Sequence, residues 1–505
     1  MPAPNPNPPA APGAASPPRV PYAFARTHGL LPLKDEGDAI VVLARGDASV
    51  EGIAELKRVL QRPLKTLSVG AERFAAELAT AYNQAAPVAQ FSEDLSRDAD
   101  LSRLLQDLPQ ADDLLGATSD APVIRMINAL LLQALRERAS DLHFEPYEGR
   151  SVVRFRVDGI LRDVVEPPRA LHAALVSRLK VMASLDIAEK RLPQDGRMAL
   201  KLGDKSVDVR VSTLPTGAGE RVVLRLLDKD AARLDLAALG MSAPTRDAVD
   251  RLVREPHGIV LVTGPTGSGK TTTLYAAMSR LPRGQLNVMT AEDPIEFALD
   301  GVGQTQVNPR IDYSFARALR SILRQDPDVV MIGEIRDLET AQIAVQASLT
   351  GHLVLATLHT NDAVSAVTRL ADMGVETYLL ASSLLGVLAQ RLVRCLCPAC
   401  RVAQAPTPGE AALLSGVGLP ATTRLWQPVG CAECGGSGYR GRTGVYELVL
   451  IDPELRRLIH DRAGEPALRE AAVRAGVKSL RADGARWLAD GTTSLAELVR
   501  VTGAA

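Results

Sequence analysis

The chain has 505 residues, of which 46% are hydrophobic, and this length predicts about three or four domains, not one core. Its formal net charge is -1 at pH 7, whereas nucleic-acid-binding surfaces carry a basic excess, so nucleic acid is disfavoured as the main substrate. A membrane-spanning helix is also excluded, because no apolar run approaches the roughly 20 residues that it requires.

The first 20 residues are rich in Pro and Ala and lack the basic segment and apolar core of an export signal. We therefore expect a disordered tail, 1–20, on a cytoplasmic protein with reduced thiols. Residues 21–90 alternate short apolar runs with helical patterns, which predicts a small α/β domain. Residues 91–120 carry many acids and few bases, which predicts an acidic linker.

Residues 121–235 form a second expected unit, with an apolar helix followed by strands. The third unit, 239–505, alternates apolar strands with amphipathic helices, which predicts a mostly parallel sheet covered by helices. The strands expected in the third unit lie at 258–263, 287–291, 329–332 and 353–357. The helices expected there begin at 270 and span 315–324, 339–349, and, in a helical C-terminal tail, 453–459, 465–475 and 495–501.

A phosphate-binding loop follows the first of these strands. It matches G-x-x-x-x-G-K-[ST] and comprises Gly264, Pro265, Thr266, Gly267, Ser268, Gly269, Lys270 and Thr271, with Thr272 next in the helix. Such a loop turns its backbone N–H groups toward phosphate oxygens, while Lys270 adds a positive charge and the Thr271 hydroxyl ligates Mg²⁺. The alternative of a chance glycine-rich turn is disfavoured by the strand before the loop and the helix after it.

Acidic residues follow two further strands of the third unit. Glu292 and Glu296 come after the second expected strand, and Glu334 comes after the third. In a doubly wound sheet the carboxyl ends of parallel strands line the ligand crevice, so these carboxylates are candidates to polarise water or to hold Mg²⁺. His359 follows the fourth strand and is a candidate to sense the γ-phosphate. A solvated loop carboxylate or a structural histidine is the plainer alternative for each residue alone.

Four motifs of the third unit together resemble the ATPases that drive type II secretion, type IV pili and type IV secretion. In that family the segments 264–271, 290–296, 323–337 and 350–361 are the Walker A motif, the Asp box, the Walker B motif and the His box. Segments of the second unit resemble the family as well, and they lie at 139–146, 154–159, 191–197 and 211–221. The resemblance implies an α/β multidomain fold, with a RecA-like P-loop ATPase domain after a PAS-like α/β domain.

The same resemblance implies a homo-hexamer that hydrolyses ATP with Mg²⁺. It also implies arginines that reach the phosphates from the second unit, for which Arg210 and Arg225 are our candidates. Each could instead be a solvent-facing strand residue. Arg320, Arg324 and Arg336 are further candidates for phosphate or intersubunit contacts.

The cysteines point to a metal site. Cys397 and Cys400 form one C-x-x-C pair and Cys431 and Cys434 form another, which together predict a tetrahedral structural zinc site in a module at 393–440. Incidental buried thiols are the alternative. The remaining Cys395 is expected to be a packed thiol.

The cysteine module and the N-terminal unit resemble the type II secretion members of the family. That resemblance implies docking of residues 21–90 on the cytoplasmic domain of the inner-membrane protein L, with protein F as a further partner. The ATPase would then be peripheral on the cytoplasmic face of the inner membrane, with no direct contact with nucleic acid. A pilus assembly motor, a DNA-uptake translocase and a non-enzymatic nucleotide-gated scaffold are the alternatives.

Overall fold

The computed structural model describes residues 20, 22–35, 38–71, 73–74, 77–78, 121–202, 205–228 and 235–503. The chain divides into two compact units, one made of Met1–Val157 and Leu161–Leu227 and the other of Asp158–Ile160 and Asp228–Ala505. Within the described ranges, no helix has the length and apolarity that crossing a membrane requires. The expected linker at 91–120, and the expected tail except for Val20, lie outside the described residues.

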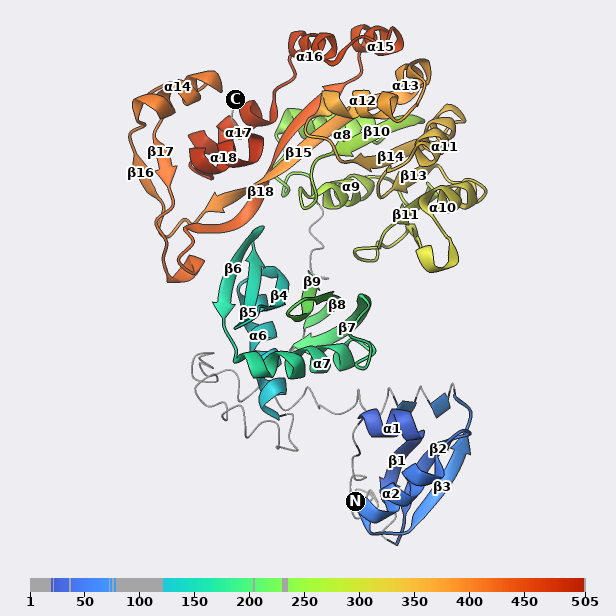
Figure 1. The fold of residues 1–505 in the computed structure, drawn as a ribbon. Coiled ribbons are helices and arrows are strands. Elements are labelled where there is room, and N and C mark those ends of the chain that lie inside the picture. The colour runs from blue at the N-terminus through green and yellow to red at the C-terminus, as the bar shows by residue number, and fades with distance from the viewer. Residues whose placement is uncertain are drawn as a thin grey trace, which may run out of the picture. The chain divides into compact units, whose positions relative to one another are not determined.

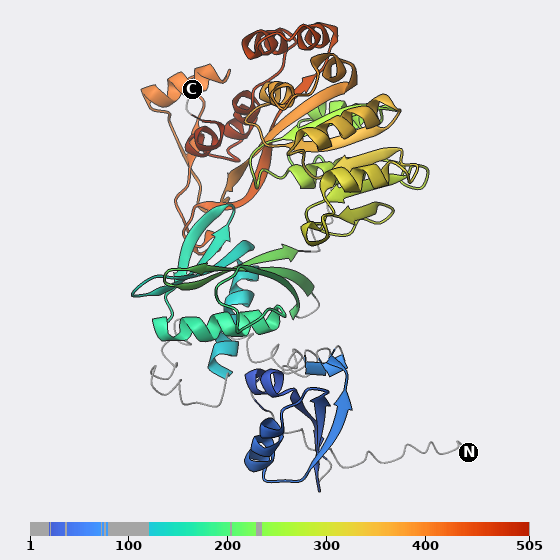
Figure 2. The same ribbon diagram turned by 45° about the vertical axis from the view of Figure 1, so that its right-hand side comes forward.

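A small α/β domain comes first. Its elements are α1 (Tyr22–His28), β1 (Leu30–Asp35), β2 (Ile40–Arg45), α2 (Val50–Leu60) and β3 (Leu64–Val69). The strands, drawn in blue in Figure 2, form a sheet. Their order is β1-β2-β3, in which β1 pairs antiparallel and β3 pairs parallel with β2. Helix α2 begins where the Ser49 hydroxyl accepts a bond from the Gly52 N–H, and it buries Leu56 against the sheet. Val20 is buried in the same core.

The next domain is a six-stranded sheet with two helices on one face (Figure 1). Its α-helices are α6 (Ala121–Arg136) and α7 (His172–Met182), and the short 3-10 helix η2 (Arg169–Leu171) precedes α7. Its strands are β4 (Ala139–Pro146), β5 (Ser151–Val157), β6 (Ile160–Val165), β7 (Gln194–Leu202), β8 (Lys205–Thr216) and β9 (Gly219–Asp228), in the order β6-β5-β4-β9-β8-β7. Alternate residues of β4, such as Leu142 and Phe144, are buried against α6 and α7. The intervening Asp141, His143 and Glu145 lie on the opposite face, as the pleat requires.

The P-loop domain contains a seven-stranded sheet in the order β12-β11-β13-β14-β10-β15-β18, parallel except for the last pair. Its strands are β10 (Gly258–Thr263), β11 (Val288–Glu292), β12 (Gly303–Gln306), β13 (Val329–Ile332), β14 (Leu353–Leu358), β15 (Leu384–Leu396) and β18 (Tyr439–Leu450). The central strands are buried at every position, as expected for parallel strands covered on both faces. The mostly parallel sheet predicted from the sequence is therefore confirmed.

Helices cover both faces of this sheet (Figure 1). Helices α8 (Ala243–Leu252) and α9 (Lys270–Met278) share one core with the sheet. The other core contains α10 (Phe315–Ile322), α11 (Leu338–Leu349), α12 (Ala363–Asp372) and α13 (Thr377–Ser383), and the short η3 (Pro309–Ile311) precedes α10.

Strands β15 and β18 form a long antiparallel hairpin that extends beyond the sheet (Figure 1). The segment between them contains β16 (Val402–Gln404), α14 (Pro408–Gly416), β17 (Leu425–Gln427) and η4 (Ala432–Cys434). The C-terminal helices are α15 (Pro453–His460), α16 (Glu465–Arg474), α17 (Leu480–Ala489) and α18 (Leu495–Thr502). The expected module at 393–440 overlaps the two hairpin strands, because β15 continues to Leu396 and β18 begins at Tyr439. Helix α17 was not predicted from the sequence.

Candidate functional site

The phosphate-binding loop connects β10 to α9. Two of its glycines, Gly267 and Gly269, have φ values of 80° and 87°, which are left-handed values that favour glycine. Gly264 leaves no room for a side chain, because a Cβ there would lie 2.5 Å from the backbone oxygen of Gln390. These glycines allow the loop to turn tightly against β15 before the helix begins at Lys270.

The Lys270 ammonium lies inside this loop. Its Nζ donates to the backbone oxygens of Gly264, at 2.8 Å, and of Pro265, at 3.1 Å. Burial lowers the pKa of Lys270 to about 8, with Glu334 opposing and Arg391 adding to the effect. The loop carbonyls therefore take the acceptor position that phosphate oxygens occupy when a phosphate-binding loop is loaded.

Glu334 and His359 converge beside the loop. Glu334 follows β13 and His359 follows β14, two neighbouring parallel strands. His359 Nε2 lies 3.4 Å from Glu334 Oε2, and Arg336 pairs with the other carboxylate oxygen. Burial is the main cause that lowers the pKa of His359, and Lys270 lowers it further, so the imidazole is neutral at neutral pH. The structure thus brings together a carboxylate, an imidazole and the Lys270 ammonium.

Glu292 is buried in a separate hydrogen-bond network. It is the last residue of β11, not the residue after the strand as predicted, and it is 2% exposed. Its carboxylate accepts bonds from Thr290 Oγ1 at 2.5 Å, from Gln304 Nε2 at 3.0 Å and from the Tyr275 hydroxyl. Glu292 therefore connects β11 to α9 and β12. Glu296 lies in the loop that follows and is half-buried.

The candidate arginines differ in their surroundings. Arg210 lies on β8 and Arg225 on β9, where the Arg225 Nε donates to Asp141 Oδ1 at 2.9 Å. Arg320 pairs with Glu339. Of the three arginines from the P-loop domain that we considered, Arg336 is the one that contacts Glu334.

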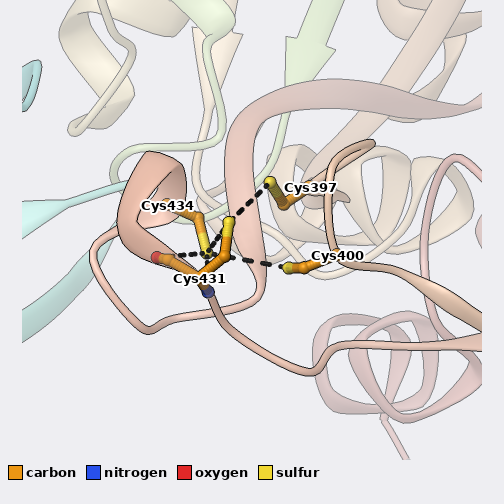
Figure 3. Close-up of side chains that lie close together, drawn as sticks. All are labelled: Cys397, Cys400, Cys431 and Cys434. Atoms are coloured by element: carbon orange, nitrogen blue, oxygen red, sulfur yellow. Dashed lines mark hydrogen bonds between the residues drawn. The ribbon is translucent and has the colours of Figure 1, made fainter.

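The cysteine pairs converge as predicted: Figure 3 shows the four side chains turned toward one another. Their sulfur atoms all lie within 4.8 Å, with Cys397–Cys431 and Cys400–Cys434 at 3.9 Å and Cys431–Cys434 at 3.8 Å. Four thiolates at about 2.3 Å from a central zinc ion would lie about 3.8 Å apart, so the donor set fits tetrahedral zinc. Cys395 is not part of the group, and burial raises the pKa of its thiol to about 11.

Backbone N–H groups further support the thiolate cluster. The N–H of Gly430 donates to Cys400 Sγ at 3.3 Å, and the N–H groups of Cys431 and Gly438 donate to Cys434 Sγ at 3.2 Å. Such bonds stabilise sulfur in its charged form, which is the form that binds metal.

Sequence reasoning missed Gln390 and Arg391, which end beside the phosphate-binding loop from β15. The apolar run 384–389 that precedes them was a possible signal, since it predicts another buried strand of the same sheet. Tyr275 and Gln304, which bind Glu292, carry no comparable signal.

Two family models match the chain. The model described as "Type II/IV secretion system protein" matches residues 116–500, and a model for an N-terminal domain of "GSPII protein E" matches residues 19–82. Together the two matches cover most of the residues that the structure describes.

Curated relatives match at nearly full length. The chain is 57% identical over 486 residues to the type II secretion system protein HxcR of Pseudomonas aeruginosa, covering 96% of this chain and 99% of that protein. It is 53% identical over 487 residues to the type II secretion system ATPase E of Vibrio cholerae, covering 96% of each. Among solved structures, the pilus retraction motor PilT with bound ADP is similar in fold, with a TM-score of 0.51, 23% identity, and coverage of 74% of this chain and 96% of PilT.

Proposed function

Because the chain belongs to the type II/IV secretion system protein family, we infer that it is the ATPase that powers a type II secretion system. The observation that carries this inference is the convergence of Lys270, Glu334 and His359 beside the phosphate-binding loop. A carboxylate and a neutral imidazole next to a phosphate cradle suit hydrolysis of a terminal phosphoryl group. The relatives are named for type II secretion, which supports this function over pilus assembly or DNA uptake.

The site residues divide the chemistry among them in our proposal. The loop amides and Lys270 hold the β- and γ-phosphates, and Thr271 offers its hydroxyl to Mg²⁺, which neutralises developing charge when bound. Glu334 orients the attacking water, and His359 contacts the γ-phosphate and keeps the Glu334 carboxylate in place. Glu292 fixes α9 through Tyr275. Glu296 lies in the following loop and remains a further candidate to polarise water or to hold Mg²⁺.

Arginines complete the site by stabilising charge on the transferring phosphoryl group. Arg210 and Arg225 are our candidates, because positive charge added to that of Lys270 accelerates phosphoryl transfer. The ion pair of Arg225 with Asp141 fixes the direction of its guanidinium.

We also propose a homo-hexamer with peripheral attachment to the inner membrane. The match of residues 19–82 to the N-terminal domain model supports docking of this region on the cytoplasmic domain of protein L, and protein F is a further partner. Nucleic acid is not a partner in this proposal, since the formal net charge is -1.

The four cysteines hold a structural zinc ion in our proposal. Four protein ligands leave no open coordination position, so the ion stabilises the segment between β15 and β18 and takes no part in hydrolysis.

Binding and hydrolysis of Mg-ATP by the purified chain test the proposed function. Lys270→Ala should abolish both activities and protein export, whereas Lys478→Ala, which removes an exposed lysine, should preserve them. Hydrolysis that persists in Lys270→Ala would contradict the proposal.

Docking is tested separately by capture on the immobilised cytoplasmic domain of protein L. The full chain should be retained, and a chain beginning at residue 121 should not, while still binding Mg-ATP. Equal retention of both chains would exclude the N-terminal domain as the docking surface.

A further inference from the structure

Gln390 contacts the phosphate-binding loop from the neighbouring strand. Strand β15 pairs parallel with β10, and its Ala389 lies opposite Thr263, the last residue before the loop. The next side chain, Gln390, is 1% exposed, and its Nε2 donates to the backbone oxygen of Ser268 at 2.6 Å. Its Oε1 has no hydrogen-bond partner within the part of the chain that the structure describes. The bond to Ser268 is therefore the contact through which Gln390 acts on the loop.

This bond determines which way one peptide group faces. The carbonyl of Ser268 and the N–H of Gly269 belong to the same planar trans peptide, so they point in opposite directions. Because Gln390 holds the carbonyl on the β15 side, the Gly269 N–H is directed to the other side, as in loops that cradle phosphate. Gly269 has a φ of 87° and lacks a Cβ, so its own backbone preference does not fix this orientation.

Arg391 supports the same arrangement from the next position. Its Nη2 donates to the Asn361 backbone oxygen at 2.8 Å, and its Nη1 would lie 3.2 Å from a Cβ placed on Gly264. Thr263 at the start of the loop accepts a bond from the Thr360 N–H at 2.9 Å. The middle of β15 thus contacts both the loop and the segment that carries His359.

We propose that Gln390 is a positioning residue for nucleotide binding, which turns the Ser268–Gly269 peptide so that the Gly269 N–H faces the phosphate. This inference rests on the proposed function. It explains why a buried polar side chain ends beside the loop, where an apolar residue could not hold the carbonyl. Without the bond, the peptide can rotate, and the free loop is less often in the binding orientation.

The test compares Mg-ATP binding by three purified full-length variants. Gln390→Ala removes the amide, and Gln390→Met keeps the length of the side chain but cannot donate to the Ser268 carbonyl. Gln342→Ala, on the exposed face of α11, is the matched control. We expect the Kd and the KM for Mg-ATP to rise about tenfold in both Gln390 variants, with kcat at saturating Mg-ATP changed less than about twofold. The control should match the wild type.

The melting temperature without nucleotide separates positioning from a general loss of stability. If Gln390→Met does not fold, Gln390→Leu, which also lacks a donor, decides the question. The inference would be overturned if the Gln390 variants kept the wild-type Kd and KM for Mg-ATP. It would also be overturned if a rise in these values were explained by a loss of folded protein. If the wild type itself binds no Mg-ATP, the proposed function fails. If binding is lost in Lys270→Ala but stays at the wild-type level in Gln390→Met, this inference alone is overturned.

Discussion

Glu334 and His359 face each other across the ends of two neighbouring parallel strands, with Oε2 and Nε2 3.4 Å apart. Because burial lowers the pKa of His359, its imidazole is neutral at neutral pH. Such an imidazole can donate one hydrogen bond without adding a full positive charge. The carboxylate therefore keeps its capacity to accept a proton from water.

Replacement of Glu334 by Gln should separate binding from hydrolysis. The amide keeps the shape of the side chain but cannot act as a base, so the Kd for Mg-ATP should stay near the wild-type value while kcat falls at least about 100-fold. Steady-state hydrolysis and equilibrium binding measure the two quantities. Glu470→Gln, at an exposed position of α16, is the control. An unchanged kcat in Glu334→Gln would remove this residue from the catalytic role.

Nucleotide binding should take up a proton near pH 8. The pKa of Lys270 is about 8 in the free protein, chiefly because of burial, so about half of the chains lack this proton at pH 8. Phosphate oxygens favour the charged ammonium and raise its pKa, which predicts uptake of about half a proton per Mg-ATP at pH 8 and almost none at pH 6.5. Affinity should accordingly fall as the pH rises above 8.

Calorimetric titrations in two buffers of different ionisation enthalpy measure this uptake. The His359→Asn variant should show the same uptake, since the imidazole is already neutral at pH 8. Uptake that is largest near pH 6 would instead assign the proton to His359.

Local patterns were sufficient to predict the centre of the P-loop domain. The strands at 258–263 and 329–332 were predicted at their exact ends, because short apolar runs bounded by polar residues mark buried parallel strands. Because Glu334 and His359 each follow one of two adjacent parallel strands, the sequence indicates both as site candidates, and the structure adds their contact.

Pairing between distant segments was not predictable in the same way. The hairpin of β15 and β18 joins strands separated by the cysteine segment, and Arg391 and Arg394 interrupt the apolar pattern of β15. The register of β15 against β10 places Gln390 beside the loop. The sequence around Gln390 does not specify this register, because it depends on how two distant strands pair. The hydrogen bonds around Glu292 were not predictable for the same reason, because Tyr275 and Gln304 belong to other elements that meet Glu292 only in the folded chain.

Zinc content should depend on the four clustered cysteines and not on the fifth. Cys431→Ser removes one ligand of the proposed site, so we expect loss of bound zinc and a lower melting temperature, whereas Cys395→Ser should keep both values. Elemental analysis of the purified full chain and thermal unfolding provide the measurements. Equal zinc in the two variants would contradict the assignment of the ligands.

Glu497 ties the C-terminal helix α18 to the hairpin. Its side chain is fully buried, with Oε2 2.8 Å from the Arg394 Nη2 and Oε1 2.7 Å from the Arg500 Nη2. Burial alone would raise its pKa, but hydrogen bonds from Arg500 and Arg394 outweigh this effect and lower the pKa to about 2. A carboxyl group with a depressed pKa stabilises the fold above its unfolded pKa of 4.5, and this contribution is lost as the pH falls from 4.5 through 2.

Glu497→Gln should therefore lower the free energy of unfolding at pH 7 by about 3 kcal/mol, because it leaves two arginines without their buried counter-charge. The difference from the wild type should shrink by about 1 kcal/mol at pH 4, where the unfolded carboxyl group is already largely protonated. Glu454→Gln is the matched control, since its partner Arg474 is 2.7 Å away but both side chains are about half exposed. Its effect should stay below about 1 kcal/mol at either pH. Urea unfolding at the two pH values measures both variants, and a difference for Glu497→Gln that grows toward pH 4 would refute the sign of this linkage.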